Sequence, residues 1–263
     1  MKYDLPDVIR VDADGPLRIV RLNRPEQLNA INDELHLGLT RLFPQLSADT
    51  DARVAVITGE GRAFSAGGDF DLLDRMANDR ALRHDVIAEG RELVLNMLRC
   101  RVPVVAAVNG PAVGLGCSVI ALSDVVYMAE SAYLSDPHVT VGLVAADGGP
   151  LTWPLHTSLL LAKEYAFTGD RITAARAAEI GLANHVCPDA EVVAAATAAA
   201  HKIAKLPRQA VEATKRVLNL HVERSVLATI DFAMAAETES FDMPELRANV
   251  DRFLGREGER ASS

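Results

Sequence analysis

Two glycine-rich segments contain the residue types that could bind a reacting group through the backbone. They are GEGRAFSAGGD at residues 59–69 and NGPAVGLGC at residues 109–117. Each follows a short β-branched run and leads into an apolar helical stretch, so each is expected to end at a helix N-terminus, where backbone N–H groups are free. Glycine lets a ligand approach the chain closely, and two such loops can converge on one developing oxyanion.

Several other chemistries are excluded by residue identity and spacing. Gly114 and Gly116 are followed by Val119, where a dinucleotide-binding GxGxxG motif needs glycine. FSAG resembles a nucleophile elbow, but residue 63 is alanine, so Ser65 is interpreted as a loop hydroxyl. No two of the seven histidines lie within five residues of each other, and the three cysteines form no CxxC pair. No metal site is therefore expected.

The composition is that of a globular protein with one large domain and a smaller appendage. The chain has 263 residues, of which 49% are hydrophobic and 24% are charged. A net charge of −9 disfavours nucleic acid or an anionic membrane as the main partner. The acidic start and the lack of any long apolar run predict no targeting or membrane-spanning segment. With widely spaced cysteines, this favours a cytoplasmic protein.

The elements that must position the glycine-rich loops alternate between strands and helices. Apolar runs predict strands at 17–22, 53–59, 102–110 and 124–129, and helical periodicity predicts helices over 35–46 and 81–101. After residue 162 the pattern becomes helical, with Thr173 before a helix that Gly181 ends, and Pro207 opening the next. Asp242 and Glu245 resemble a capping box for a final helix. The fold class is therefore α/β with a helical C-terminal segment.

Four segments in this order resemble the crotonase superfamily of enoyl-CoA hydratases and isomerases. They are NRPEQLNAI, AFSAGGDFDLL, PVVAAVNGPAVGLGCSVIALSDVVYMAESA and VGLVAADGG, within a match that spans about residues 17–183. The resemblance implies a spiral of ββα units over residues 1–200, which carries an acyl-CoA site. It also implies that the helical residues 201–263 form trimers or dimers of trimers.

The family binds a bent coenzyme A thioester, with no further cofactor, and holds the thioester oxygen with two backbone N–H groups. By motif position these groups belong to Gly68 and Leu115. Residues at the positions that contact coenzyme A in the family are Leu28, Ala30, Ala66 and Gly67. Arg24 and Arg62 flank these segments and are either ligands of the coenzyme A phosphates or exposed salt-bridge partners.

The proton-transferring positions depart from the family pattern. Hydratases use two glutamates, and the corresponding residues here are Ser118 and His138. Serine is not a base near neutrality, so a neutral His138 is expected to accept the proton, with a rate that rises with pH. Asp147 follows nine residues later and is expected to be its partner, since β-diketone hydrolases of the superfamily have His and Asp at this interval. Those hydrolases have a further histidine at the place of Leu115.

Three functions remain open. The leading hypothesis is an enzyme that stabilises a thioester enolate and hydrates or isomerises an enoyl-CoA, using His138 and Asp147. The alternatives are a carbon–carbon bond hydrolase of a β-dicarbonyl substrate and a homologue that binds acyl-CoA without turnover. Among other acidic residues, Asp69 is interpreted as a helix cap. Glu237 and Glu239 are expected on a solvated or intersubunit face, with the alternative that one of them reaches the active site.

Overall fold

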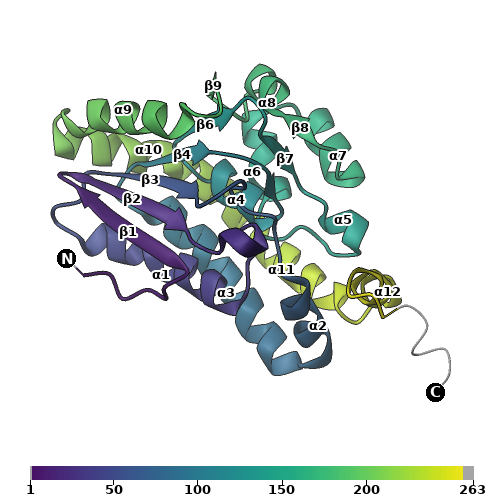
Figure 1. Cartoon of the computed structure of the whole chain (residues 1–263). Helices are drawn as coiled ribbons and strands as arrows, with labels where there is room; N and C mark the ends of the chain where they lie inside the picture. The colour runs from purple at the N-terminus through teal and green to yellow at the C-terminus, as the bar shows by residue number, and fades with distance from the viewer. Residues whose placement is uncertain (1, 257–263) are drawn as a thin grey trace.

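The computed structural model describes residues 2–256. Its main sheet has the strand order β1-β2-β3-β4-β6-β9 (Figure 1). The six strands span Ile9–Asp14, Leu17–Leu22, Val54–Gly59, Val104–Val108, Val125–Ala129 and His185–Cys187 in chain order. β1 and β2 form an antiparallel hairpin, and the other neighbours are parallel. Parallel strands meet with their carboxyl ends at one edge, where ligands bind in open α/β sheets.

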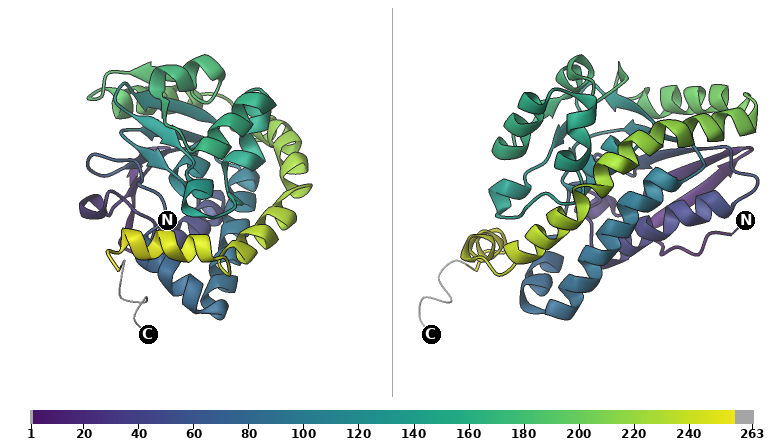
Figure 2. Two further views of the ribbon diagram at one scale, coloured as in Figure 1. Left: turned by 90° about the vertical axis from the view of Figure 1, so that its right-hand side faces the viewer. Right: turned by 180° about the vertical axis from the view of Figure 1, so that it is seen from behind.

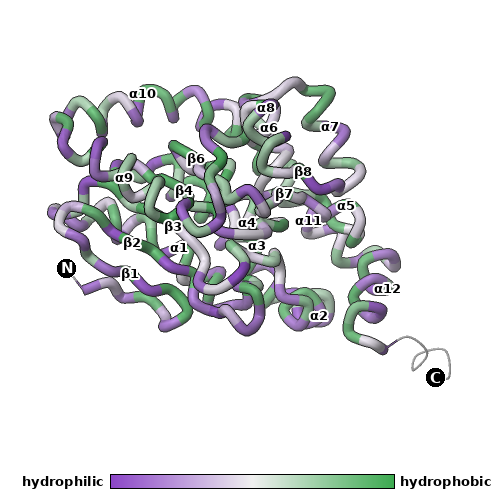
Figure 3. Tube along the Cα trace, turned by 45° about the horizontal axis from the view of Figure 1, so that its top comes forward, coloured by the Kyte–Doolittle hydropathy of each residue, from purple (hydrophilic) through white to green (hydrophobic). Residues whose placement is uncertain are grey.

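Helices bury both faces of this sheet, which explains why the central strands read as continuous apolar runs. Val56 and Val105 face α9 (Val192–Ala204), whose alanines at 196, 200 and 204 pack on this side. The alternate side chains Ile57 and Ala106 face the larger core, formed with α1 (Asp33–Ala48) and α3 (Arg80–Arg99). The hydropathy-coloured trace shows apolar β3 and β4 lying between these helices (Figure 3).

A second, three-stranded sheet has the order β5-β7-β8 and stands beside the glycine-rich loops. Its strands span Ala112–Val113, Tyr133–Ser135 and Ile172–Thr173. Each glycine-rich loop ends at a helix, as predicted: α2 (Phe70–Asn78) and α4 (Leu115–Ala121). Four short helices follow: α5 (His138–Val141), α6 (Gly149–His156), α7 (Leu159–Thr168) and α8 (Ala174–Ile180).

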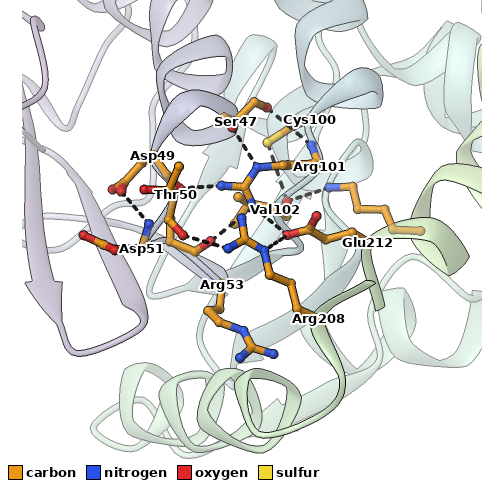
Figure 4. A network of polar contacts seen from close by, with 12 residues as sticks. Ser47, Asp49, Thr50, Asp51, Arg53, Cys100, Arg101, Val102, Arg208 and Glu212 are labelled. Carbon is orange, nitrogen blue, oxygen red and sulfur yellow. Dashed lines mark hydrogen bonds and ion pairs between the residues drawn. The ribbon is translucent and has the colours of Figure 1, made fainter. Parts of the chain in front are cut away.

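The C-terminal helices wrap around one side of the sheet assembly. They are α10 (Arg208–Leu227), α11 (Ile230–Ser240) and α12 (Pro244–Phe253), which run past α3 and end beside α2 (Figure 2). A polar network fixes the start of α10 (Figure 4). Arg101 donates to the Ser47 carbonyl at 2.7 Å and pairs with Glu212, and Arg208 donates to the Thr50 carbonyl at 2.7 Å. The segment is therefore tied to the core by specific contacts.

The predicted strands and long helices are confirmed, with end positions shifted by a few residues. Thr173 accepts from the Arg176 N–H, and Gly181 ends α8 with φ +90°, as the cap pattern predicted. The capping box at the last helix is wrong: Met243 precedes α12, and Asp242 instead pairs with Arg83. The boundary predicted after residue 200 falls inside α9. None of the helices within residues 2–256 combines the length and hydropathy that a bilayer crossing requires.

Candidate active site

A cavity of about 480 Å³ lies where the glycine-rich loops meet the helical part of the chain. Both loops line it, together with residues of α2, α3, α5, α11 and α12. Most of the lining is apolar, and the polar side chains are His36, Thr140, His138, Asp147, Glu237, Asn249 and Arg252. A mostly apolar cavity with a few convergent polar groups is typical of a small-molecule site.

The first backbone donor of the cavity is the N–H of Gly68. Ile31 and Gly68 form a parallel bridge, in which the Ile31 N–H donates to the Gly67 carbonyl at 2.8 Å and the Asp69 N–H donates to the Ile31 carbonyl at 3.1 Å. These bonds use the neighbours of Gly68, so its own N–H points away from the bridge. It donates to no atom of residues 2–256. Gly68 lines the cavity and leaves this donor available to a ligand.

The second donor is the N–H of Leu115, the first residue of α4. The N–H groups around it are used: Gly114 donates to the Ser135 carbonyl at 2.9 Å, and Ser118 donates to the Gly114 carbonyl at 3.1 Å. The Leu115 N–H has no acceptor in the described chain. Gly114 has φ +52°, and a Cβ built on it would lie 4.0 Å from the Gly68 nitrogen. The two loops therefore converge as predicted.

His138 begins α5 and forms a buried ion pair that the sequence prediction missed. Its Nδ1 contacts Asp136, whose side chain is 1% exposed and also accepts from the Gly149 N–H at 3.2 Å. Burial disfavours the charged ring, but the adjacent Asp136 carboxylate outweighs it and raises the pKa of His138 to about 10. The same pairing lowers the pKa of Asp136 despite its burial. This pairing favours the imidazolium at pH 7, where a neutral imidazole was expected.

The imidazolium lies beside the backbone donors. A Cβ built on Gly114 would lie 3.6 Å from His138 Cε1 and 4.0 Å from the Gly68 nitrogen, so the ring and this backbone donor flank the same point. A positive charge there favours negative charge on any oxygen that the two N–H groups hold.

Asp147 lines the same cavity but contacts Ser118 rather than His138. The Ser118 hydroxyl donates to Asp147 Oδ1 at 3.0 Å. A Cβ on the adjacent Gly148 would lie only 1.8 Å from the Ser118 hydroxyl oxygen, so glycine is required for the loop to approach α4 this closely. His138 and Asp147, expected to be partners across the pocket, form no direct hydrogen bond with each other in the described residues. Both side chains nevertheless line one cavity.

Glu237 on α11 supplies a third acidic group, although a solvated or intersubunit face was expected for it. The residue is 9% exposed and lines the cavity. Burial, reinforced by the Asp147 charge, raises the pKa of Glu237 to about 8, so the carboxyl is protonated at neutral pH. Glu239, two residues later, is exposed, as expected. Glu237 and the glycine-rich loops meet at the cavity only through the tertiary fold. No local sequence motif therefore indicated that Glu237 lies at the site.

The residues at family coenzyme A positions lie around the first loop. Ala66 and Gly67 line the cavity. Leu28 is held with φ +52° in a loop braced by the buried Asn29, which donates to the Ala63 carbonyl at 2.9 Å; Ala30 follows it. Asp69 caps α2 as predicted, accepting from Asp71.

The two candidate phosphate ligands differ in their surroundings. Arg24 pairs with Asp69 at 3.2 Å, so it forms a salt bridge, the alternative to a role as phosphate ligand. Arg62 is exposed. Within residues 2–256, no His, Cys, Asp and Glu side chains are grouped to hold a metal ion.

Comparison with known proteins gives consistent matches over the chain. The family model described as enoyl-CoA hydratase/isomerase matches residues 13–259. A crystal structure of an enoyl-CoA hydratase/isomerase from Mycobacterium paratuberculosis is 65% identical, covers 95% of this chain and 100% of its own, and has a TM-score of 0.93.

Two relatives are more distant and differ in reaction. The human mitochondrial Delta(3,5)-Delta(2,4)-dienoyl-CoA isomerase is 34% identical over 88% of this chain and 74% of its own length. The 2,3-dehydroadipyl-CoA hydratase of Escherichia coli is 32% identical over 90% and 89%, respectively.

Proposed function

The chain belongs to the enoyl-CoA hydratase/isomerase family, as an enzyme with the crotonase fold, and from this premise we propose that it shifts a double bond in an enoyl-CoA thioester. The observation that carries this proposal is the set of groups in one cavity: two free backbone N–H donors, one carboxylate, one imidazolium and one protonated carboxyl. Such a set offers one base and two acids around a bound thioester.

The N–H groups of Gly68 and Leu115 hold the thioester oxygen in this mechanism. Removing a proton beside the carbonyl places negative charge on that oxygen, and preorganised donors stabilise it by several kcal/mol in comparable sites. The His138 imidazolium, held by Asp136, adds a positive charge beside them. Proton abstraction from the carbon next to the thioester thereby becomes feasible.

Asp147 is the base of the proposed reaction. His138 is charged and Glu237 protonated at neutral pH, so neither accepts a proton readily. The Asp147 carboxylate takes the proton from the carbon beside the carbonyl, the double bond shifts along the enolate, and His138 or Glu237 donates a proton at the far end. His138 and Asp147 thus remain the principal pair, with the acid and base roles exchanged relative to the sequence hypothesis.

Hydration is less well supported by these groups. The family hydratases use two glutamates, and one of the two positions here is Ser118, whose hydroxyl is bonded to Asp147. Hydrolysis of a carbon–carbon bond is the alternative suggested by the spacing of His138 and Asp147, but Leu115 stands where those hydrolases have a histidine.

Incubation of enoyl-CoA positional isomers with the enzyme in heavy water, read by mass spectrometry, tests the assignment. We expect a product with an unchanged carbon skeleton, no added water and incorporated deuterium. A product heavier by one water means hydration, and a split skeleton means carbon–carbon hydrolysis. Binding without deuterium exchange means a non-catalytic homologue, and each of these three results refutes isomerisation.

The coenzyme A part of the substrate is proposed to lie along the first glycine-rich loop. Ala66 and Gly67 contact it at the cavity, and Leu28 and Ala30 contact it from the braced loop before α1. Exposed Arg62 is the better phosphate ligand of the two candidates, because Arg24 is already paired with Asp69. Loss of CoA affinity on Arg62→Ala, measured by calorimetry, tests this.

We also propose that the enzyme assembles as a trimer or a dimer of trimers through its C-terminal segment and adjacent helices. One protomer exposes large apolar side chains on α7, α10 and α11, including Leu160 (80% exposed), Leu218 (61%) and Phe232 (81%). Such surfaces are typical of protein–protein contacts. A cytoplasmic location stays a prediction, for which the three free thiols are suited.

A further inference from the structure

His36 lines the cavity with a ring that the proposed mechanism does not use. It lies on α1, its side chain is 8% exposed, and it lines the cavity among apolar residues of α3 and α11. Its Nδ1 contacts Glu89 at 3.0 Å. No atom of residues 2–256 forms a hydrogen bond with its other ring nitrogen, Nε2. Because Nε2 has no partner among these residues and yet is not a fully buried atom, it is open to the cavity and suited to a ligand.

The Glu89 contact determines what Nε2 can bind. A carboxylate accepts hydrogen bonds, so the Nδ1 atom that faces Glu89 carries the ring proton. With the proton on Nδ1, the other ring nitrogen, Nε2, presents a lone pair to the cavity and accepts a hydrogen bond. A hydroxyl group satisfies it, whereas a methyl or methylene group does not.

Gly90 on α3 keeps the space beside Nε2 open. A Cβ at this position would lie 3.7 Å from His36 Nε2 and 4.0 Å from Met234 Cε, both ordinary contact distances. The glycine is therefore not needed to prevent a clash. In the interior of this 20-residue helix, glycine is also less stabilising than alanine. What an alanine methyl would change is access to the imidazole, because it would occupy cavity volume directly beside Nε2.

We propose that His36 is a specificity-determining residue that recognises a hydroxyl on the acyl chain, away from the thioester. The proposal rests on the acyl-CoA function proposed above and names its substrate class: acyl-CoA thioesters with a hydroxylated acyl chain. The apolar walls hold the hydrocarbon, and Nε2 accepts the hydroxyl proton. Without this nitrogen the same cavity rejects a hydroxyl, since burying an unpaired hydroxyl is unfavourable.

Calorimetry with non-reacting ligands tests the proposal. The probes are saturated acyl-CoA thioesters of increasing chain length and the ω-hydroxy counterpart of each, so that every pair differs by one oxygen. At the length that reaches Nε2, the wild-type enzyme should bind the hydroxylated member about five- to tenfold more tightly.

Two variants separate the hydrogen bond from the shape of the cavity. His36→Leu should reverse the preference, so that the hydroxylated member binds about tenfold more weakly than the plain one. Gly90→Ala leaves the imidazole in place and favours the helix, yet should abolish most of the preference by covering Nε2. His84→Leu, at an exposed position of α3, is the matched control and should leave the preference unchanged.

Equal affinities for both members at every chain length overturn the inference, as does a preference that survives both His36→Leu and Gly90→Ala. In these cases the plain thioesters still bind and the proposed function stands. If no member of either series binds, the acyl-CoA function fails, and the assignment of His36 fails with it. Gly90→Ala keeps the test decisive if His36→Leu does not fold.

Discussion

Replacing Asp136 by asparagine removes the charge that keeps His138 protonated. The amide has nearly the same shape, and its oxygen can still accept from the Gly149 N–H, which is bonded to Asp136 at 3.2 Å. What changes is the electrostatic environment of the ring. Burial alone lowers the pKa of a histidine, and Asp136 is the strongest influence that opposes it. Asp136→Asn should therefore make His138 neutral at the pH of the assay.

The expected loss of turnover follows from the pKa of His138 in the wild type and in Asp136→Asn. A change of the His138 pKa from about 10 to the ordinary value of about 6.5 corresponds to a shift of more than three units, or roughly 4 to 5 kcal/mol. At pH 8 the charged fraction then falls from about 99% to about 3%. If the imidazolium is required, turnover at pH 8 should fall about 30-fold and recover as the pH is lowered towards 6.

Two measurements check this reasoning. In histidine-labelled protein, the ¹⁵N signal of His138, identified by its loss in His138→Gln, should titrate near pH 10 in the wild type and at or below 6.5 in Asp136→Asn. Asp170→Asn, at an exposed position, should change neither value. A wild-type His138 that titrates near 6.5 refutes the charge assignment. A turnover loss in Asp136→Asn that is the same at every pH refutes the role of the charge.

The raised pKa of His138 should also make the free energy of unfolding depend on pH. Because the folded pKa of His138 is raised, its contribution to the free energy of unfolding is complete below about pH 6.5 and is lost as the pH rises through about 10. Between these values the wild type should lose stability more steeply than Asp136→Asn in denaturant titrations.

Three further outcomes are expected. Asp147→Asn should lower turnover by about 10²- to 10⁴-fold with little change in CoA affinity, and unchanged turnover would exclude Asp147 as the base. Gly68→Pro removes an N–H that no atom of residues 2–256 accepts, so turnover should fall by about 10²- to 10³-fold while circular dichroism shows a folded protein. Wild-type turnover should decline as the pH rises past about 8, where Glu237 loses its proton, and Glu237→Gln should remove that decline from the pH–rate profile.

The central elements could be predicted because their signals are local. The apolar runs of β3 and β4 identify strands buried on both faces, and the cap residues Thr173 and Gly181 mark both ends of α8. The short strands β5 and β8 have two residues each and no periodicity to detect. The predicted capping box failed because Asp242 pairs with Arg83 on a distant helix, and this tertiary contact competes with the local hydrogen bond.

The residues of the candidate site likewise fall into those with a local sequence signal and those placed by tertiary contacts. The backbone donors of Gly68 and Leu115 depend on glycine-rich turns that can be read from the chain, and both residues line the cavity. The charge of His138 depends on Asp136, and the sequence shows this carboxylate two residues away but not its burial. Glu237 is separated from the loops by about a hundred residues or more, so its place in the cavity emerges only when α11 packs against α3.

In the proposed mechanism, the exchange of acid and base roles between His138 and Asp147 originates in Ser118. A family glutamate at this position would fill the space beside α4, whereas the serine hydroxyl leaves room for the chain at Gly148 and bonds the Asp147 carboxylate at 3.0 Å. The carboxylate that α4 does not supply thus comes from the loop before α6. If Asp147 is the base, as we propose, a neutral histidine is not needed, and the His138 ring paired with Asp136 supplies the positive charge for an enolate. Ser118, Gly148 and Asp136 therefore act together, and substitution of Ser118 by glutamate should expel Asp147 from the cavity rather than restore a hydratase.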